Sequence, residues 1–405
     1  MKVLIVNTNA REGSIGKIAF GLYSYLTNNG HEAIVCYRSI NEEKIDNSHF
    51  IELESRLEFY FAVFMARLTG LESHFSFFST RKLKKLVETY KPDIIQIYNL
   101  HGNYIRSYAF LNFLKKKDIP VVYSMLDEFP YMGKCAFPID CEKFKIECNN
   151  CPQKDKYPES WILDQSKKLF YKKKECYANF KRLVFTGPPY VCQRAKQSFL
   201  LRDKQIEELY EPFNFDDYFY PRDVNGLKSS LGISDSDRVV VCASGTYFRK
   251  GGHYFLDVAK KLQHVADLKF VFVGYEDAAK WEFPNNVIVQ PIINNQDLFA
   301  EFMSLGDAYV CTSVGDTTPS VCLCALGCGT PIIGFDYGGV KDCAPNEFGT
   351  YVPIGDVNAL ADVICTVKVK TGEDIKKIRG YAVDTFSFGK VYKEQELLYN
   401  KIINI

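Results

Sequence analysis

Short apolar runs alternate with helical stretches along the whole chain, and this alternation restricts the fold more than any other feature. The runs cover residues 2–8, 32–37, 93–99, 120–125, 182–187, 238–244, 269–274, 287–293, 308–313 and 330–336. Strands that alternate with helices pair in parallel and bury both faces of their sheet under helices. The ten runs fall into two sets of five, so they predict an α/β protein with two Rossmann-like domains, each built on a parallel sheet.

The length of the chain also indicates more than one core. A chain of 405 residues with 47% hydrophobic composition exceeds what a single domain usually holds. Residues 211–226 carry two prolines and no clear period, so we place the connection there. We expect a first domain at 1–212 with a Cys-rich insertion at 132–160, a second domain at 213–385, and a terminal helix at 386–405 that packs back on the first.

Charge is divided unevenly between the two halves. The net charge is +1, but residues 1–212 carry 32 Lys and Arg against 25 Asp and Glu, a balance of +7. Residues 213–405 carry 18 against 24, a balance of −6. A solvated surface explains this split, and so does a basic first domain that faces an anionic lipid surface or phosphate.

The apolar segments indicate a cytoplasmic protein that is either soluble or peripheral at the inner face of the cell membrane. The start, MKVLIVNTNA, is typical of a first strand and not of a secretory signal, and 14 cysteines without such a signal indicate reduced thiols. The run at 59–66 is far shorter than the ~20 residues of a membrane span. Residues 51–90 are expected to be helical, and two interpretations stay open: a helix pair that covers the sheet, or a contact with the membrane surface.

Two strand-to-helix junctions have residues that suit an anionic ligand. After the first strand, Gly13, Ser14 and Gly16 allow a tight turn and a close approach of the backbone, although many such turns use glycine for geometry alone. After the first strand of the second set, Arg249 and Lys250 precede two glycines. Two cations at this place suit a diphosphate, and the alternative is an ordinary solvated turn.

A third loop, within residues 313–342, opens a helix of small residues that leads through a buried strand to a Gly-Gly turn. Asp316 is the only carboxylate in the sequence between Asp307 and Asp336. Backbone N–H groups at a helix start bind anions, so we expect a ligand to contact Asp316 and the residues that follow it. These residues are Thr317, Thr318, Pro319, Ser320 and Val321.

Four cysteines lie within 17 residues in the segment CAFPIDCEKFKIECNNC. They are Cys135, Cys141, Cys148 and Cys151. Four thiolates can hold a structural zinc ion, although this spacing matches no common zinc finger and four reduced cysteines in a loop are the alternative. A zinc ion would hold the insertion rigid next to Asp127.

Several long segments resemble the retaining nucleotide-sugar glycosyltransferases of family 4, and in particular a bacterial polysaccharide-biosynthesis branch. The resemblance covers nearly the whole chain. It is carried by NAREGSIGKIAFGLYSYLTNNGHE, IYNLHGNYI, NNCPQKDKYPESW, FRKGG, NNQDLFAEFMSLGDAYVCTS and CGTPIIGFDYGGVKD. It implies the GT-B fold, in which two Rossmann-like domains face each other across a cleft, with the donor nucleotide on the second domain.

On the donor side, the resemblance implies an Arg/Lys pair on the phosphates and a Glu-x7-Glu motif on the sugar and ribose. Lys250 matches the lysine of the family, and Gly245 stands where many members have the arginine, a charge that Arg249 can supply. Asp316 matches the first acid of the motif, but Cys324 stands at the second. A thiol replaces poorly a carboxylate that accepts hydrogen bonds from ribose hydroxyls.

On the acceptor side, the resemblance implies a His-Asp pair after the strand at 120–125, and this chain has Leu126 and Asp127 there. Leucine can neither donate a hydrogen bond nor move a proton. The Asn-Gly of this branch near the interdomain connection is likewise replaced, by Glu211-Pro212. We expect Asp127 and Asp316 to be catalytic and His101 to lie on the acceptor side.

Three functions follow from these residues. The first is a hexosyltransferase that moves a sugar from a nucleotide-diphosphate sugar to a glycan or lipid-linked acceptor in surface polysaccharide biosynthesis, with no metal required because cations neutralise the phosphates. The second is a catalytically impaired homologue that binds a sugar or a partner protein, and the third is a phosphorylase or epimerase on a related scaffold. Dispersed basic residues and the lack of a recognised module argue against nucleic-acid binding.

Overall fold

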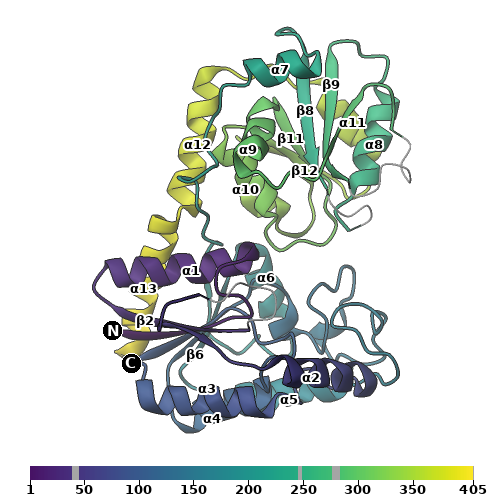
Figure 1. The fold of residues 1–405 in the computed structure, drawn as a ribbon. Coiled ribbons are helices and arrows are strands. Elements are labelled where there is room, and N and C mark those ends of the chain that lie inside the picture. The colour runs from purple at the N-terminus through teal and green to yellow at the C-terminus, as the bar shows by residue number, and fades with distance from the viewer. Residues whose placement is uncertain (39–44, 245–248, 276–282, 405) are drawn as a thin grey trace. The chain divides into compact units, whose positions relative to one another are not determined.

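The computed structural model describes residues 1–38, 45–244, 249–275 and 283–404. The chain divides into two compact units (Figure 1). Met1–Pro212 and Val391–Ile405 form the first unit, and Phe213–Lys390 forms the second. Each unit contains a parallel β-sheet with helices, so the α/β class with two Rossmann-like sheets that the sequence predicts is confirmed.

Seven strands form the sheet of the first unit, in the order β3-β2-β1-β4-β5-β6-β7. They are β1 (Lys2–Val6), β2 (Glu32–Tyr37), β3 (Phe50–Glu52), β4 (Ile94–Ile97), β5 (Val121–Ser124), β6 (Leu183–Gly187) and β7 (Ile206–Glu208). Val3 of β1 pairs with Ala33 of β2 and with Ile94 of β4. The central strands are buried along nearly their whole length, as a parallel sheet between two helix layers requires.

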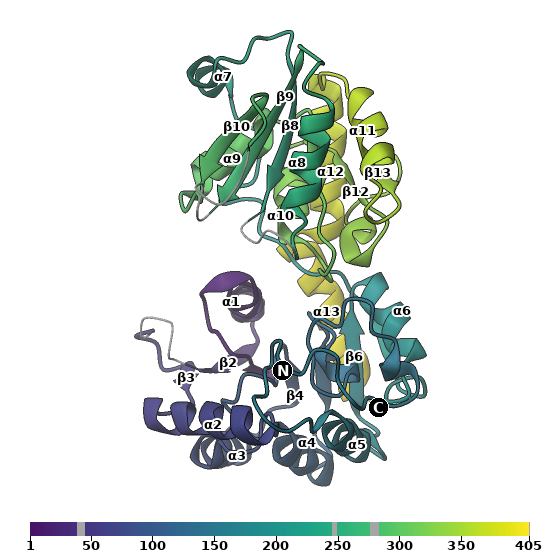
Figure 2. The same cartoon turned by 90° about the vertical axis from the view of Figure 1, so that its right-hand side faces the viewer.

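Helices cover both faces of this sheet. They are α1 (Gly13–Asn28), α2 (Arg56–Thr69), α3 (Phe77–Tyr90), α4 (Ser107–Lys116), α5 (Ser166–Tyr177), α6 (Pro189–Gln197) and, after the second unit, α13 (Phe388–Ile403). α1 lies on one face, and α3, α4 and α5 lie on the other (Figures 1 and 2). Two short 3-10 helices, η1 (Phe129–Tyr131) and η2 (Lys143–Lys145), lie in the long segment between β5 and α5.

The terminal helix α13 packs against the first unit through buried polar groups. Tyr392 donates its hydroxyl to the carbonyl oxygen of Ile18 at 2.8 Å. Gln395 and Tyr399 both donate to Oε1 of Gln96 on β4, each at 2.8 Å. A hydrogen bond that satisfies a buried polar group is costly to remove, so these contacts fix the helix in one position.

Six strands form the sheet of the second unit, in the order β10-β9-β8-β11-β12-β13. They are β8 (Arg238–Ala243), β9 (Leu268–Tyr275), β10 (Val287–Pro291), β11 (Ala308–Cys311), β12 (Ile332–Phe335) and β13 (Gly349–Val352). The helices are α7 (Asn225–Leu231), α8 (Gly252–Lys261), α9 (Gln296–Leu305), α10 (Ser320–Gly327), α11 (Val357–Cys365) and α12 (Gly372–Phe386), with a 3-10 helix η4 (Gly338–Cys343). Phe255 of α8 packs on Phe270 and Phe272 of β9 at the centre of the core.

Candidate active site

The candidate residues of both units gather where the strand order of the sheet changes direction. In the first sheet β1 leads to β2 on one side while β4 lies on the other, and β8 and β11 have the same relation in the second sheet. Loops at the carboxyl ends of two such strands leave in opposite directions, and open α/β sheets bind their ligands there. Each unit therefore has one candidate site, after β1 and β4 in the first and after β8 and β11 in the second.

In the second unit, two cations converge on one carboxylate. Arg249 and Lys250 follow β8, and Asp316 follows β11. Nη1 of Arg249 lies 2.8 Å from Oδ1 of Asp316, and Nζ of Lys250 lies 2.7 Å from Oδ2. Ser313 donates its hydroxyl to the same Oδ2 at 2.5 Å. The structure thus brings Asp316 next to two cations that precede it in the sequence by 67 and 66 positions.

The charges of this cluster do not cancel. Burial opposes the ionisation of Asp316, but the charges of Lys250 and Arg249 and the hydrogen bonds to its oxygens outweigh burial and hold its pKa below the usual range. Two cations against one carboxylate leave an excess positive charge. The Arg249 side chain is 39% exposed whereas Asp316 is 10% exposed, so an anion meets the cations first. The cluster suits a doubly charged phosphate group better than a neutral sugar.

The Gly338-Gly339 turn sets the position of the loop that carries Asp316. The N–H of Gly339 donates to the carbonyl oxygen of Asp316 at 2.9 Å. A Cβ at Gly339 would lie 1.5 Å from the carbonyl oxygen of Thr317, and one at Gly338, where φ is +62°, would lie 2.6 Å from that of Asp316. In both cases the added Cβ would meet a backbone oxygen, which leaves no room for a side chain. Glycine at these two positions is therefore a requirement of the site's geometry.

We expect Gly339→Ala to destabilise the protein by ~3 kcal/mol or more, because the added methyl group displaces the Asp316 loop. Gly380→Ala is the matched control. Gly380 lies inside α12 with no atom within 4 Å of its would-be Cβ and no positive φ, so alanine there should stabilise by ~0.5–1 kcal/mol. Chemical unfolding of both variants measures the difference, and equal effects at the two positions would contradict the packing argument.

The residues after Asp316 lead into a helix start. Pro319 immediately precedes α10, which begins at Ser320. Within the part of the chain that the structure describes, the buried hydroxyl oxygen of Thr318 has no hydrogen-bond partner. Thr317 is buried against the Gly-Gly turn, and the first N–H groups of α10, including that of Val321, lie at the positive end of the helix dipole. This arrangement adds backbone donors to the charge of the cation pair.

Two other expected donor-side positions are less informative. Cys324 is buried in α10, at 6% exposure, where the family's second acid would stand. Its thiol is surrounded by the core of the second unit and is not placed to replace an exposed carboxylate. Gly245 lies outside the residues that the structure describes.

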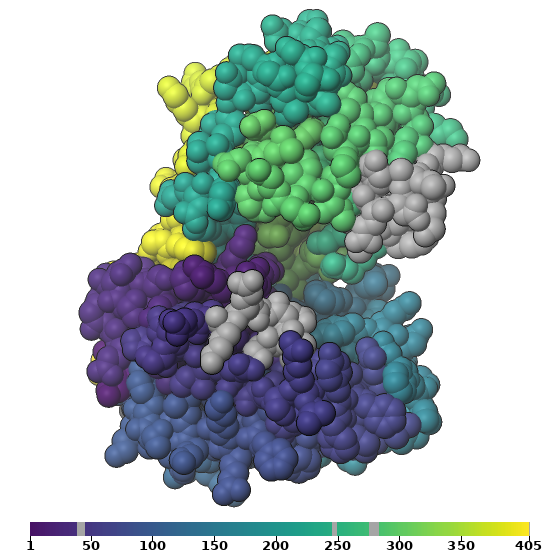
Figure 3. Space-filling view, in the orientation of Figure 1, coloured from purple at the N-terminus to yellow at the C-terminus, as the bar shows by residue number. Residues whose placement is uncertain are grey.

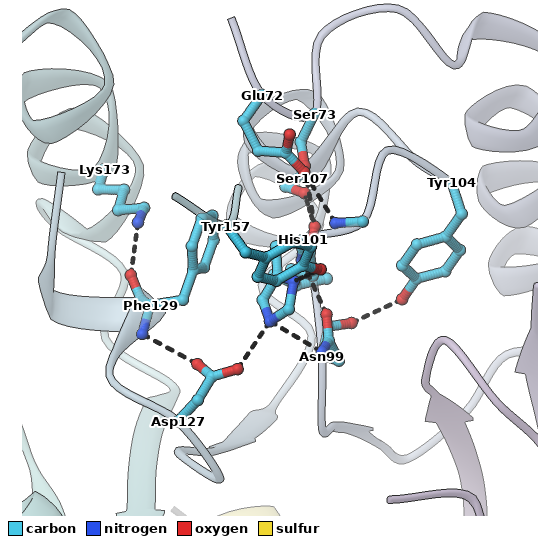
Figure 4. A network of polar contacts seen from close by, with 12 residues as sticks. Glu72, Ser73, Asn99, His101, Tyr104, Ser107, Asp127, Phe129, Tyr157 and Lys173 are labelled. Atoms are coloured by element: carbon cyan, nitrogen blue, oxygen red, sulfur yellow. Dashed lines mark hydrogen bonds and ion pairs between the residues drawn. The ribbon is translucent and has the colours of Figure 1, made fainter. Parts of the chain in front are cut away.

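In the first unit, His101 and Asp127 form a hydrogen-bonded dyad (Figure 4). His101 follows β4, Asp127 follows β5, and Nε2 of His101 lies 2.7 Å from Oδ2 of Asp127. The hydroxyl of Tyr157 lies 2.8 Å from Nδ1. The contacts with Asp127 and Tyr157 are satisfied together when Nε2 donates its proton to Asp127 and Nδ1 accepts the proton of Tyr157. The amide nitrogen of Asn99 lies 3.0 Å from Nε2, and in this tautomer it forms no hydrogen bond with the ring. Leu126 leaves no histidine next to Asp127 in sequence, but the fold supplies one from the neighbouring strand.

The loop that carries His101 is fixed by buried polar groups. The N–H of His101 donates to Oδ1 of Asn99 at 2.9 Å. Glu72 is buried and accepts the N–H of Gly102 at 2.8 Å and the side-chain amide of Asn103 at 2.7 Å. A carboxylate that accepts two N–H bonds holds a loop firmly, since charge-assisted hydrogen bonds are about twice as strong as neutral ones.

The turn that carries Asp127 is held by a buried amine. The N–H of Phe129 donates to Oδ1 of Asp127 at 2.9 Å. Lys173 donates to the carbonyl oxygens of Phe129 and Met132 and lies over the ring of Phe129, 3.4 Å from its centroid. Burial lowers the pKa of Lys173 to about 7. The dyad therefore stands on a rigid frame, which is what a positioned catalytic group needs.

The glycine loop after β1 lies beside this site, because a Cβ at Gly102 would lie 3.4 Å from the side chain of Thr8. A Cβ at Gly16 would lie 2.8 Å from the backbone of Arg11, so this glycine is required by packing alone. Gly13 begins α1 with φ +69° and nothing within 4 Å of its would-be Cβ, and Ser14 is exposed. Of the expected loop residues, Gly13 and Ser14 are thus open to a ligand and Gly16 is not.

A buried acid that follows β3 gives the protein a pH-dependent stability. Burial, opposed by the charge of Arg38, raises the pKa of Glu54 to about 8. The fold therefore favours the protonated acid, and stability falls as pH rises from about 4.5 to 8. We expect Glu54→Gln to match the wild type at pH 4.5 and to exceed it by on the order of 2 kcal/mol at pH 8. Unfolding titrations across this range measure the gap, and a constant gap would contradict the assignment.

The four cysteines of the insertion lie in different environments. A hydrogen bond between Cys135 and Cys151 raises the pKa of Cys135 and, with Lys134 nearby, lowers the pKa of Cys151 to about 6. Cys148 instead packs in the core, where its sulfur accepts the N–H of Gly133 at 3.2 Å. Across the described ranges, no group of three or more His, Cys, Asp or Glu side chains is placed to hold a metal ion. The arrangement described in this segment is a hydrogen-bonded thiol pair, and a zinc ion held by the four cysteines stays a prediction.

A cavity of about 390 Å³ lies elsewhere in the second unit. Its walls include Ala308, Ile332 and Gly349, which are the first residues of β11, β12 and β13. It therefore opens at the amino ends of the strands, opposite to Asp316. Ligands of open α/β sheets bind at the carboxyl ends, so we do not assign the donor to this cavity.

Sequence comparisons relate parts of the chain to known proteins. Residues 237–368 match the family model described as glycosyl transferases group 1. N-acetyl-alpha-D-glucosaminyl L-malate synthase of Bacillus anthracis is 23% identical over 214 residues, which are 50% of this chain and 55% of that protein. The putative colanic acid biosynthesis glycosyl transferase WcaC of Escherichia coli (strain K12) is 22% identical over 220 residues, 52% of each. The chain thus spans about half the length of the curated relatives it matches.

A solved structure extends the comparison to the whole chain. Anabaena Alr3699/HepE in complex with UDP-glucose superposes on it with a TM-score of 0.62 at 14% identity, over 99% of this chain and 100% of that one. The fold is GT-B. The part of the GT-B chain that matches the group 1 family contains Arg249, Lys250 and Asp316, the cluster at the switch point of the second sheet.

Several residues of the two GT-B sites do not emerge from the sequence. Tyr157 reaches His101 from 56 positions away, within an insertion that has no periodic pattern. Glu72 lies 30 positions before the loop it holds. Ser313 precedes Asp316 by three residues, and this spacing, in a loop that follows a buried strand, is the one signal that indicates a local hydrogen bond to the acid.

Proposed function

We propose that this GT-B chain is a retaining glycosyltransferase of the hexosyltransferase type. It moves a sugar from a nucleotide-diphosphate sugar to a glycan or lipid-linked acceptor in surface polysaccharide biosynthesis. The observation that carries the proposal is the convergence of Arg249 and Lys250 on the Asp316 loop at the switch point of the second sheet. The group 1 match, the UDP-glucose complex of HepE and the name of WcaC support the donor class and the pathway.

On the donor side, Arg249, Lys250 and the start of α10 bind the diphosphate. A leaving diphosphate gains negative charge in the transition state, and fixed cations and helix N–H groups stabilise that charge without reorganising. In the absence of donor, Asp316 forms ion pairs with both cations. The diphosphate takes over these ion pairs and leaves the carboxylate of Asp316 to accept hydrogen bonds from the sugar. The two cations neutralise the phosphates, so the proposed reaction requires no added metal ion.

On the acceptor side, Asp127 accepts a hydrogen bond from the attacking hydroxyl. His101 and the N–H of Phe129 already bind one lone pair on each of its oxygens, which fixes the carboxylate and leaves the remaining lone pairs for the acceptor. A positioned carboxylate that takes up a hydroxyl proton contributes typically 10²–10⁴-fold to a rate. We place this reaction in the cytoplasm at the inner face of the cell membrane, where lipid-linked acceptors are held.

A second function is favoured by one specific observation. Cys324 is buried and cannot stand in for the second acid, which removes a charged contact to the donor ribose. The alternative is a catalytically impaired homologue that binds a nucleotide sugar and acts as a sugar-binding or accessory protein for another transferase.

A donor screen separates the two functions. The purified full chain is incubated with UDP-, GDP-, ADP- and dTDP-sugars, and both nucleoside diphosphate release and thermal stabilisation are measured. Turnover with one donor is the expected result. Stabilisation by a donor without turnover, in the presence of cell-derived glycan and lipid acceptors, would establish the non-catalytic function. Neither response to any donor would overturn both.

A further inference from the structure

Helix α2 presents its large apolar side chains to solvent and its small ones to the core. Leu57, Tyr60, Phe61 and Phe64 recur at i, i+3, i+4 and i+7, so they share one face of the helix. All four are exposed, Leu57 at 86%, whereas the buried residues of α2 are two alanines. In Figure 3 the dark-blue α2 region lies on the face toward the viewer. A helix that only covered the sheet would have the opposite orientation.

The exposed face continues onto α3. Phe77 and Phe78 begin that helix, and Phe78 is 77% exposed. Glu58 of α2 accepts the N–H of Phe78 at 2.6 Å and that of Ser79 at 3.0 Å. These two bonds hold the starts of the helices together, so their phenylalanines belong to one surface.

The face also continues onto the segment that ends the Cys-rich insertion. Trp161 contacts Phe64 edge to face, with 6.1 Å between ring centroids. The backbone N–H of Trp161 donates to the carbonyl oxygen of Arg67. Exposed Ile162 and Leu163 follow it. We call these residues, together with the four of α2 and the two of α3, the aromatic surface. Monomeric proteins rarely expose so many contiguous large apolar side chains without a partner.

Arginine side chains border the aromatic surface. The guanidinium of Arg67 lies over the ring of Trp161, 5.6 Å from its centroid, and that of Arg106 lies over Phe77 at 4.3 Å. Cations stacked on interfacial rings keep their charge at the level of lipid phosphates while their stems cover apolar surface. Both arrangements present the charge at the edge of the apolar side chains.

The exposed charge near this surface is predominantly positive. Arg56 and Arg81 are exposed on the first turns of α2 and α3. Of the nearby acids, Glu58 is engaged by the N–H groups of α3, and Glu159 pairs with Arg67 at 3.4 Å. Anionic headgroups complement this pattern better than a neutral protein face does.

We propose that the aromatic surface binds the surface of an anionic lipid bilayer, with its rings at headgroup level and its arginines on lipid phosphates. None of the helices within the described ranges is long and apolar enough to cross a bilayer, so the contact is interfacial. The combination of Trp, Tyr, Phe and Leu on one helix face with bordering Arg is the composition that interfacial helices use.

The surface is connected to the acceptor site by a short segment of chain. Tyr157 binds His101, and six residues later the same segment reaches Leu163 in the aromatic surface. On the other flank, Arg38 lies over the ring of Phe59 of α2, 5.1 Å from its centroid. With lipid bound to the aromatic surface, this placement brings the dyad close to the bilayer. A dyad near the bilayer favours a lipid-linked acceptor over a free glycan, an inference that rests on the proposed function.

Sedimentation with vesicles tests the proposal on the full chain. We expect the wild type to pellet with phosphatidylcholine vesicles that contain phosphatidylglycerol, and less with phosphatidylcholine alone. The triple variant Leu57→Ser, Phe61→Ser, Phe64→Ser should bind at least ~10-fold more weakly. The matched control, Val369→Ser with Leu397→Ser, removes exposed apolar side chains outside the aromatic surface and should bind like the wild type.

A fluorescence measurement does not depend on the triple variant. In a chain that keeps Trp161 as its only tryptophan, the emission should shift to the blue when anionic vesicles are added. Absence of both pelleting and shift would overturn the proposal. Equal vesicle binding by the triple variant and the wild type would also overturn it. A wild-type oligomer that dissociates in the triple variant would do the same if neither protein binds vesicles. A donor-induced thermal shift measured in parallel separates these outcomes from a failure of the proposed function.

Discussion

Lys250→Ala is expected to weaken nucleoside diphosphate binding by roughly tenfold to a hundredfold, because a charge-assisted hydrogen bond contributes about 1.5–3 kcal/mol. Arg249 remains to hold Asp316, together with the hydroxyl of Ser313, so the loop keeps its position while the site loses one charge. The measurement is the thermal shift produced by the nucleoside diphosphate of the donor that the screen identifies, each variant being compared with its own unliganded melting temperature.

Lys260→Ala is the matched control for this substitution. Lys260 is exposed on α8, in the same unit and ten positions further along the chain. Its removal changes the net charge equally but leaves the cluster intact, so the thermal shift should persist. A thermal shift by nucleoside diphosphate that persists in Lys250→Ala and in the double variant with Arg249→Ala would place the phosphate elsewhere. That result would remove the observation on which the proposed transferase function rests.

Asp127→Asn is expected to lower donor turnover by ~100-fold or more and to leave the donor-induced thermal shift unchanged. The amide keeps the size of the carboxylate but cannot take up a proton, and the donor cluster belongs to the other unit. His101→Ala should give a smaller loss, because His101 acts through the orientation of Asp127. Release of nucleoside diphosphate reports turnover, and the thermal shift reports binding.

Asp118→Asn controls for the loss of a carboxylate in the same unit. Asp118 is exposed after α4 with φ 52°, a conformation that asparagine adopts as readily as aspartate. It should therefore retain both turnover and stability. Equal activity of Asp127→Asn and the wild type would show that Asp127 has no part in the reaction, and a lost thermal shift would show that its role is structural.

The sequence predicts the central strands of both sheets and one edge strand, β10, and misses the other three edge strands. β3, β7 and β13 are not expected from the patterns, and all three are edge strands of three or four residues. A central parallel strand is buried on both faces and so forms a continuous apolar run, whereas these three edge strands are short, partly exposed and have no such run. β7, with the sequence Ile-Glu-Glu, has one apolar residue and is recognisable only from its pairing with β6.

The candidate site divides in the same way between local and long-range features. Arg249 and Lys250 are predictable because a strand end, two cations and two glycines lie within a few residues. Their ion pairs with Asp316 are not, because the strand order that brings β8 next to β11 follows from the assembled sheet. The dyad of His101 and Asp127 is missed as a pair for the same reason, since its members come from neighbouring strands 26 positions apart.

The return of α13 to the first unit has a consequence for protein engineering. The second unit is, in topology, an insertion between positions 212 and 391 of the first, and its two ends pair with each other: Phe213 donates to the carbonyl oxygen of Phe386 at 2.7 Å and accepts from Phe388 at 3.1 Å. Donor modules of related chains can therefore be exchanged as a single cassette with both junctions at one place. A chain cut after residue 212, by contrast, would leave Oε1 of Gln96 without its two donors on α13, so the isolated first unit has to be produced with its terminal helix fused or supplied in trans.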